Sequence, residues 1–349
     1  MSASFAERRL QAASLTAPFP WFGGKSRAAS LVWERLGNVP NYVEPFFGSG
    51  AVLLGRPHEG KTETINDLDA FVANFWRSIA AAPEEVAAHA DWPVNEADLH
   101  ARHLRLVNMR DTLTARLMAD PDAYDAKLAG WWCWGLCAWI GTGFCSGEGP
   151  WRADEDGLLS LSNAGRGINR QLPHLGDAGR GINRQLPHLS NAGQGINRQL
   201  PHLGNAGRGE AILAWFEQLG ARLRATRIAC GSWERVVTES VTTRHGLTGI
   251  LLDPPYGNED RAEVYAHDSF DVAGQVRDWC IDNGKNPLLR IALCGYSGEG
   301  HEDLEIAGWR CETWTARGGY QNNGSQYRER IWFSPACNPS SEPSLFDAS

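Results

Sequence analysis

Residues 41–54 read NYVEPFFGSGAVLL, and this stretch decides the fold. Asn41-Tyr42-Val43 is predicted to form a short strand. The glycines after it are predicted to form a turn, and Ser49 to Leu54 to begin a helix. Glycines in such a turn let a ligand approach the backbone, and the helix start offers free N–H groups. A tight turn without a ligand has the same pattern. Because the lysine and Ser/Thr pair of a phosphate-binding loop is missing, a nucleoside triphosphate is disfavoured.

The next segment repeats the alternation of strand and helix. Residues 62–65 are predicted to be a strand and residues 70–82 an amphipathic helix, which gives a βαβ beginning and hence a parallel sheet. Asn66-Asp67-Leu68-Asp69 lies between them. In dinucleotide-binding sheets an acid about 20 residues beyond the glycine turn accepts hydrogen bonds from ribose hydroxyls. An acid here also suits the N-cap of the next helix, so we expect Asp67 and Asp69 to divide the two roles.

The remaining pattern continues the α/β alternation after a helical interval. Residues 83–140 are predicted to be mostly helical, with a tryptophan-rich core stretch at Trp131, Trp132, Trp134 and Trp139. Beyond residue 210 we expect helices at 212–223 and 272–281, strands at 227–229, 249–252 and 288–293, and a terminal hairpin from 311–315 and 328–333.

A short polar motif follows the apolar strand that ends at Leu252. Asp253-Pro254-Pro255-Tyr256 combines two prolines, which end the strand and stiffen the turn, with one carboxylate and one aromatic ring. Ligands of open α/β sheets bind at the carboxyl ends of the strands, where this motif would lie. A strand-ending turn without chemistry is the alternative.

Near the middle of the chain a 14-residue unit is repeated. LSNAGRGINRQLPH begins at Leu161, related copies begin at Leu175 and Leu189, and a shortened one begins at Leu203. Each full copy carries two glycines and one proline, so a continuous helix is excluded and successive loops or short hairpins are expected. Residues 161–209 hold six arginines against one acid, a local charge of +5, while the total charge of −8 leaves −13 for the rest. The segment is either a basic DNA-facing surface or a duplicated loop without a role.

Composition narrows the class of protein. A chain of 349 residues suggests about two domains at roughly 150 residues each, and 42% hydrophobic with 21% charged residues is typical of folded proteins. No apolar run reaches the roughly 20 residues that span a bilayer, and the N-terminus lacks the apolar centre of a signal peptide, so we expect a cytoplasmic protein. The eight cysteines form no C-x-x-C pair. They are predicted to be buried free thiols, without a metal site.

Four elements of the chain resemble the D12 class, or Dam-like family, of DNA N6-adenine methyltransferases. Pro20-Trp21-Phe22-Gly23-Gly24-Lys25 resembles the family's W-x-G-G-K element, Glu44 to Val52 its cofactor loop, Asn66-Asp67 its N-D element, and Asp253 to Tyr256 its D-P-P-Y motif. The resemblance implies a Rossmann-like S-adenosylmethionine-dependent methyltransferase sheet with an inserted target-recognition region that carries the 14-residue repeats.

The implied domain boundaries follow from these elements. Residues 1–17 would be a flexible leader, 18–82 and 225–335 the catalytic domain, 83–224 the recognition insert with repeats at 161–209, and 336–349 a disordered tail. The chain departs from the family pattern at Asp69, where relatives often have Asn. Its repeats align with no known recognition module, so the target sequence does not transfer, and a restriction endonuclease partner stays unknown.

The resemblance also implies site residues and a reaction: transfer of a methyl group from S-adenosylmethionine to adenine N6 of a base flipped out of double-stranded DNA. The implied cofactor-binding residues are Trp21, Lys25, Glu44, Phe46, Gly48, Gly50 and Asp67. The implied catalytic residues are Asp253, Pro254, Pro255 and Tyr256. The implied DNA-binding residues are Arg166, Arg170, Arg180, Arg184 and Arg198. Two alternatives stay open. One is methylation of another planar amine, in RNA or a protein glutamine. The other is a DNA-binding relative without catalysis.

Overall fold

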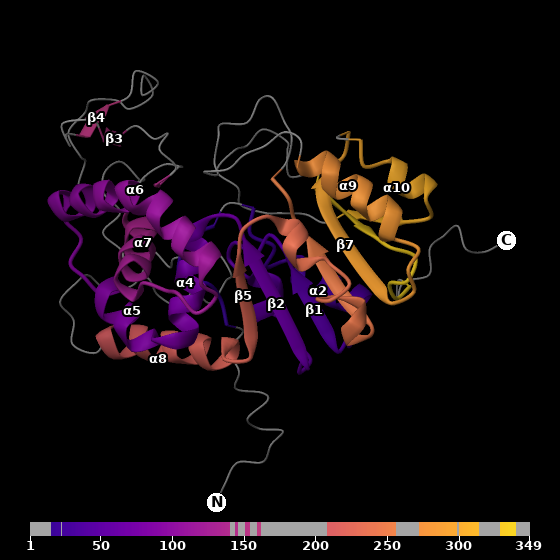
Figure 1. Ribbon diagram of the computed structural model, residues 1–349, viewed down its shortest axis with the longest axis horizontal. Helices are drawn as coiled ribbons and strands as arrows, with labels where there is room; N and C mark the ends of the chain where they lie inside the picture. The colour runs from indigo at the N-terminus through magenta and orange to yellow at the C-terminus, as the bar shows by residue number, and fades with distance from the viewer. Residues whose placement is uncertain are drawn as a thin grey trace, which may run out of the picture.

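A computed structural model of the chain describes residues 15–21, 23–139, 144–145, 151–153, 159–161, 208–255, 272–298, 300–313 and 329–339. Its centre is a seven-stranded sheet in the order β5-β2-β1-β6-β7-β9-β8 (Figure 1). The strands are β1 (Asn41–Glu44), β2 (Thr62–Asp67), β5 (Thr226–Cys230), β6 (Thr248–Leu252), β7 (Leu289–Tyr296), β8 (Arg310–Thr313) and β9 (Glu329–Phe333). The predicted α/β class is confirmed.

The first five strands in this order run parallel, β9 runs against them, and β8 runs in their direction again. In register, Tyr42 of β1 lies opposite Glu63 of β2 on one side and Gly249 of β6 on the other. β9 pairs antiparallel with both β7 and β8, as the predicted hairpin required. The chain leaves β1 toward β2 on one side and later returns to β6 on the other. This reversal places a crevice at the carboxyl ends of β1 and β6, where open α/β sheets bind ligands.

Helices cover both faces of the sheet, as a parallel sheet requires. Because neighbouring residues of a strand point to opposite faces, Tyr42 and Val43 enter two different cores. The Tyr42 side packs against α2 (Ala29–Leu36), α3 (Ala51–Leu54) and α4 (Ala70–Ala81). The Val43 side packs against η1 (Trp233–Val236), α9 (Val272–Asn283) and α10 (Asp303–Ile306).

A group of helices extends the sheet beside β5, on the left of Figure 1. With α4 it contains α5 (Pro83–Ala90), α6 (Glu96–Ala119), α7 (Ala126–Ala138) and α8 (Arg208–Leu223). Of the four residues in the predicted tryptophan-rich core stretch, Trp132, Trp134 and Trp139 are buried, as predicted, and Trp131 is half-buried. These side chains belong to the same core as Tyr42, so the helical segment after residue 83 and the sheet share one continuous core.

Two short segments near the ends of the expected domains contact the rest of the fold. Leu15 and Ala17, expected in a loose leader, pack against the core, and the Thr16 carbonyl accepts a hydrogen bond of 3.2 Å from the Trp215 indole. In the expected tail, Cys337 is buried, and the Asn338 amide donates to the Arg35 carbonyl at 2.8 Å. The neighbouring residues in the sequence are mostly polar. For this reason the sequence pattern did not predict that apolar side chains and backbone groups of these short segments contact the core.

The repeats begin beside a small hairpin, β3 (Trp151–Ala153) paired antiparallel with β4 (Leu159–Leu161). Residues 162–207, which carry the five arginines assigned to DNA, lie outside the described residues.

The cysteines are free thiols, and seven of the eight are buried, as predicted. In the described ranges, no three His, Cys, Asp or Glu side chains are grouped so that they would hold a metal ion. None of the helices described there is both long and apolar enough to cross a membrane.

Candidate active site

A pocket opens at the carboxyl ends of β1, β2, β5 and β6. It encloses about 1200 Å³, a volume that includes space open to solvent at its mouth. Residues that follow each of the four strands line it, because parallel strands end at the same edge. Of the predicted site residues, the lining includes Trp21, Lys25, Glu44, Phe46, Gly48, Asp67, Asp253, Pro254 and Pro255.

The loop after β1 takes its shape from two glycines with left-handed backbone angles. Gly48 has a φ of 48° and Gly50 a φ of 64°, which other residues adopt at a cost. A Cβ atom on Gly48 would lie 2.4 Å from the indole nitrogen of Trp21, and one on Gly50 would lie 2.4 Å from the Phe47 ring. The sequence predicted that both glycines make room for a ligand. Both glycines leave room for aromatic rings; Gly48 also lines the pocket, whereas Gly50 does not.

Hydrogen bonds hold the backbone of Gly48 at both its N–H and its carbonyl. Its N–H donates to Asp67 Oδ2 at 2.9 Å, and its carbonyl accepts from the Trp76 indole at 2.9 Å. The other Asp67 oxygen accepts from the Asp69 amide at 2.9 Å. Burial raises the pKa of the Asp67 carboxyl to about 7. Asp67 therefore couples the end of β2 to the loop after β1 and faces the same pocket.

Asp69 provides the cap that the sequence predicted at this position. Its side chain accepts a hydrogen bond of 2.9 Å from the Phe71 amide at the start of α4. Arg110 of α6 lies 3.6 Å away and compensates its charge. Asp69 also lines the pocket, next to Asp67.

The motif after β6 joins the N-terminal element through an ion pair. Lys25 Nζ lies 2.9 Å from Asp253 Oδ2 and donates to the Gly23 carbonyl at 2.8 Å. Burial opposes the charge of Lys25, but Asp253, with Cys294 and Glu329, holds its pKa above the ordinary value. Elements 228 positions apart in the sequence thus meet at one carboxylate. Tyr256, the last residue of the predicted motif, lies outside the described residues.

Sequence reasoning missed the turn after β5. Gly231, Ser232, Trp233 and Glu234 line the pocket, and the Trp233 ring stacks on Phe46 with centroids 6.3 Å apart and planes inclined by 29°. Asn66 holds this turn through bonds to the carbonyls of Pro45 and Gly231 at 3.0 and 2.9 Å. The signal was present, because a strand was predicted at 227–229 and its carboxyl end must reach the same edge.

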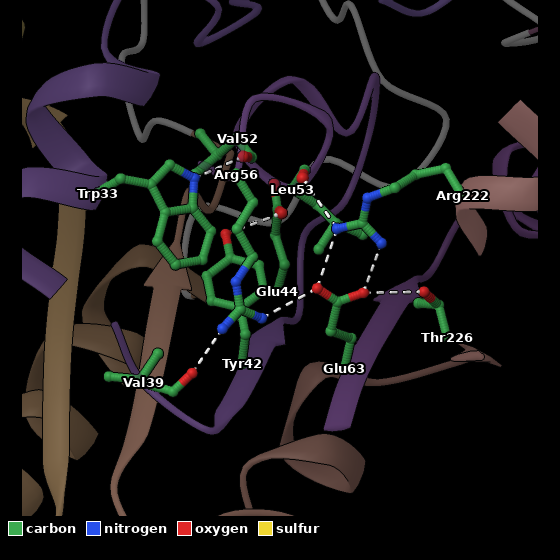
Figure 2. A network of polar contacts seen from close by, with 10 residues as sticks. All are labelled: Trp33, Val39, Tyr42, Glu44, Val52, Leu53, Arg56, Glu63, Arg222 and Thr226. Carbon is green, nitrogen blue, oxygen red and sulfur yellow. Dashed lines mark hydrogen bonds and ion pairs between the residues drawn. The ribbon is translucent and has the colours of Figure 1, made fainter. Parts of the chain in front are cut away.

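Figure 2 shows a network of polar contacts centred on Glu63 of β2. Arg222 of α8 donates to the two Glu63 oxygens at 2.7 and 2.9 Å, and Arg56 donates at 2.9 Å. Arg222 also donates to the Leu53 carbonyl in α3 at 3.2 Å. The network therefore joins α3, β2 and the helix that follows the repeats.

Glu44 lies at the pocket end of this region. Its Oε2 accepts a hydrogen bond of 2.9 Å from the Tyr42 hydroxyl, and both residues are buried (Figure 2). Burial raises the pKa of the Glu44 carboxyl to about 8. Because Tyr42 supplies a neutral donor, burial of Glu44 is only partly compensated.

The fold and the pocket define an α/β protein with a cofactor-type site at its topological switch point. Residues 21–108 match the family model of the D12 class N6 adenine-specific DNA methyltransferases. The resemblance predicted from the sequence motifs is thereby confirmed over this stretch, which contains Lys25, the Gly48 loop and Asp67. Asp253 and the turn after β5 lie beyond it. No curated protein matches the chain.

Proposed function

We propose that the protein transfers the methyl group of S-adenosylmethionine to the exocyclic N6 amine of adenine in double-stranded DNA. The observation that carries the proposal is the meeting of Asp253, Lys25, Asp67 and the Gly48 loop in one pocket. The family match over residues 21–108 points to DNA adenine methylation as the class of reaction.

The lining suits S-adenosylmethionine in charge and shape. Five acidic residues (Glu44, Asp67, Asp69, Glu234 and Asp253) and one lysine, Lys25, line the pocket. Even with the proton of Glu44 bound, the other four acids outnumber the lysine, which favours a cationic ligand. The Phe46–Trp233 pair offers an aromatic wall for a flat purine. Asp67 would accept hydrogen bonds from the ribose hydroxyls, and Trp21, Lys25 and Glu44 would line the methionine end. When bound, the cofactor supplies a methyl group made electrophilic by a positively charged sulfur.

Asp253 would prepare the acceptor amine. Adenine N6 is a weak nucleophile because its lone pair is delocalised into the ring. The Asp253 carboxylate and the Pro254 carbonyl would accept hydrogen bonds from the two amine protons and so localise the lone pair on nitrogen. Lys25 holds the carboxylate at Oδ2, and the two prolines stiffen the backbone that carries both acceptors. In this account Tyr256 stacks on the flipped base, and Arg166, Arg170, Arg180, Arg184 and Arg198 contact the duplex.

The other planar amines remain the second candidate, because a turn with two prolines and one carboxylate suits any of them. A panel of acceptors separates the two: duplex DNA, the same sequence as RNA, and a glutamine-containing peptide, each incubated with methyl-labelled S-adenosylmethionine. We expect label in duplex DNA alone. Label in RNA or peptide but not in DNA would overturn the proposal. Cofactor binding without transfer to any acceptor would favour a DNA-binding relative without catalysis.

A further inference from the structure

Glu44 differs from the other buried glutamate of this region in its partners. Glu63, on the neighbouring strand, is held by Arg56 and Arg222, whereas no ion pair among the described residues includes Glu44 (Figure 2). Glu44 nevertheless lines the pocket, and the residue is 3% exposed. A buried carboxyl without a cation is most stable with its proton bound, unless a ligand brings the positive charge.

The groups around Glu44 support this state. Tyr42 of the same strand donates from its hydroxyl, the Leu53 amide of α3 favours the ionised form, and the negative charges of Asp253 on β6 and Glu63 on β2 disfavour it. Burial is the largest influence, and together these groups raise the pKa of Glu44 to about 8. At neutral pH the carboxyl therefore keeps its proton until a cationic ligand binds.

We propose that Glu44 distinguishes the methyl donor from its demethylated product by charge: the cationic donor expels the Glu44 proton, and the neutral thioether leaves it bound. The inference rests on the proposed function. When the donor binds, the Glu44 carboxylic acid loses its proton to the buffer. The resulting carboxylate then lies beside the sulfonium of the donor. After transfer the sulfonium has become a neutral thioether, the methylated amine has given up one proton, and Glu44 takes up one proton from the buffer. Reprotonation removes the electrostatic attraction and assists release of the product.

The test is calorimetric titration of the whole protein at pH 7.5, in buffers of different ionisation enthalpy, which counts protons released on binding. The probes are S-adenosylmethionine, S-adenosylhomocysteine and sinefungin, which carries an amine in place of the sulfonium. All three share the amino acid end, so its titration cancels. With a pKa of about 8, Glu44 is roughly three-quarters protonated at this pH. Binding of either cationic probe should therefore release up to about three-quarters of a proton more than binding of S-adenosylhomocysteine.

Two variants assign the proton to Glu44. Glu44→Gln should abolish the difference in proton release between donor and product. Asp67, whose pKa is raised to about 7, is the other candidate, but it is only about one-quarter protonated at pH 7.5. Tyr42→Phe removes a hydrogen bond that lowers the Glu44 pKa, so its proton release should persist to higher pH than in the wild type.

Equal proton release for donor and product, or a difference that survives Glu44→Gln, would overturn the inference and leave the proposed function standing. If neither S-adenosylmethionine nor S-adenosylhomocysteine binds to a protein with a normal melting transition, the proposed function itself fails. Melting curves of both variants establish that they are folded.

Discussion

At the scale of single residues, the pocket depends on space that glycine leaves for aromatic rings. At Gly48 the Trp21 indole occupies the place of a side chain, and the N–H and carbonyl of Gly48 are hydrogen-bonded to Asp67 and Trp76. A larger residue would displace Trp21 and also strain a backbone held at a φ of 48°. The loop and the N-terminal element are thus fitted to each other before any ligand binds.

We therefore predict that Gly48→Ala weakens binding of S-adenosylmethionine at least ~10-fold and lowers the free energy of unfolding by about 1–3 kcal/mol. Calorimetry and denaturant unfolding measure the two effects. The matched control is Gly274→Ala in α9, where a new Cβ has no neighbour within 4 Å. It should leave binding unchanged and stabilise the helix slightly. Wild-type affinity in Gly48→Ala would show that the loop does not need this fit.

At the scale of elements, Glu63 links α8, which follows the repeats, to α3, which follows the cofactor-type loop. Burial acts to raise the pKa of Glu63, but Arg222 and Arg56 together lower it below the ordinary value of 4.5. A carboxyl with a lowered folded-state pKa stabilises the fold above its unfolded pKa and loses this contribution as the pH falls through the folded value.

We predict that Glu63→Gln destabilises the protein by about 3–5 kcal/mol near pH 7, because it leaves two guanidinium groups without their shared carboxylate. The difference from the wild type should shrink as the pH falls below about 4.5. Exposed Glu59→Gln is the control and should change the free energy of unfolding by less than about 0.5 kcal/mol. A destabilisation that does not vary with pH would exclude the ion pairs as its cause.

The positions of the strands and helices could largely be predicted from the sequence. The parallel strands lie within a few residues of their expected positions, because buried strands are short apolar runs and turn residues mark their ends. The identity of β1, β2 and β6 also fixed where Glu44, Asp67 and Asp253 would meet. The sequence pattern does not contain side-chain pairs between distant segments, such as Lys25 with Asp253. For the same reason the place of Trp233 in the pocket and the raised pKa of Glu44 could be inferred only from the packing.

For the whole molecule, the distribution of charge suggests how a protein with a net charge of −8 meets DNA. The acidic pocket fits a cation, and the segment 161–209 carries +5. We predict that replacing Arg166, Arg170, Arg180 and Arg184 by Gln weakens binding to all duplexes. The slope of log affinity against log salt should flatten by as much as ~3, since each phosphate contact contributes about 0.9.

That prediction is checked by duplex binding between low and moderate salt, with two unrelated DNA sequences. Equal weakening of both sequences is expected for phosphate contacts. If slope and affinity stay as in the wild type, the repeats have no part in holding DNA.

We propose above that this pocket methylates adenine N6 and that Asp253 prepares the amine. The most direct measurement is digestion of duplex DNA to nucleosides after incubation with S-adenosylmethionine, followed by mass spectrometry that distinguishes N6-methyladenosine from other methylated nucleosides. The wild type should produce N6-methyl-2′-deoxyadenosine alone. Asp253→Ala should produce less by a factor of about 100 or more while its cofactor affinity stays within a few-fold of the wild type. Methylation of a cytosine, or near-normal yield from Asp253→Ala, would contradict the account.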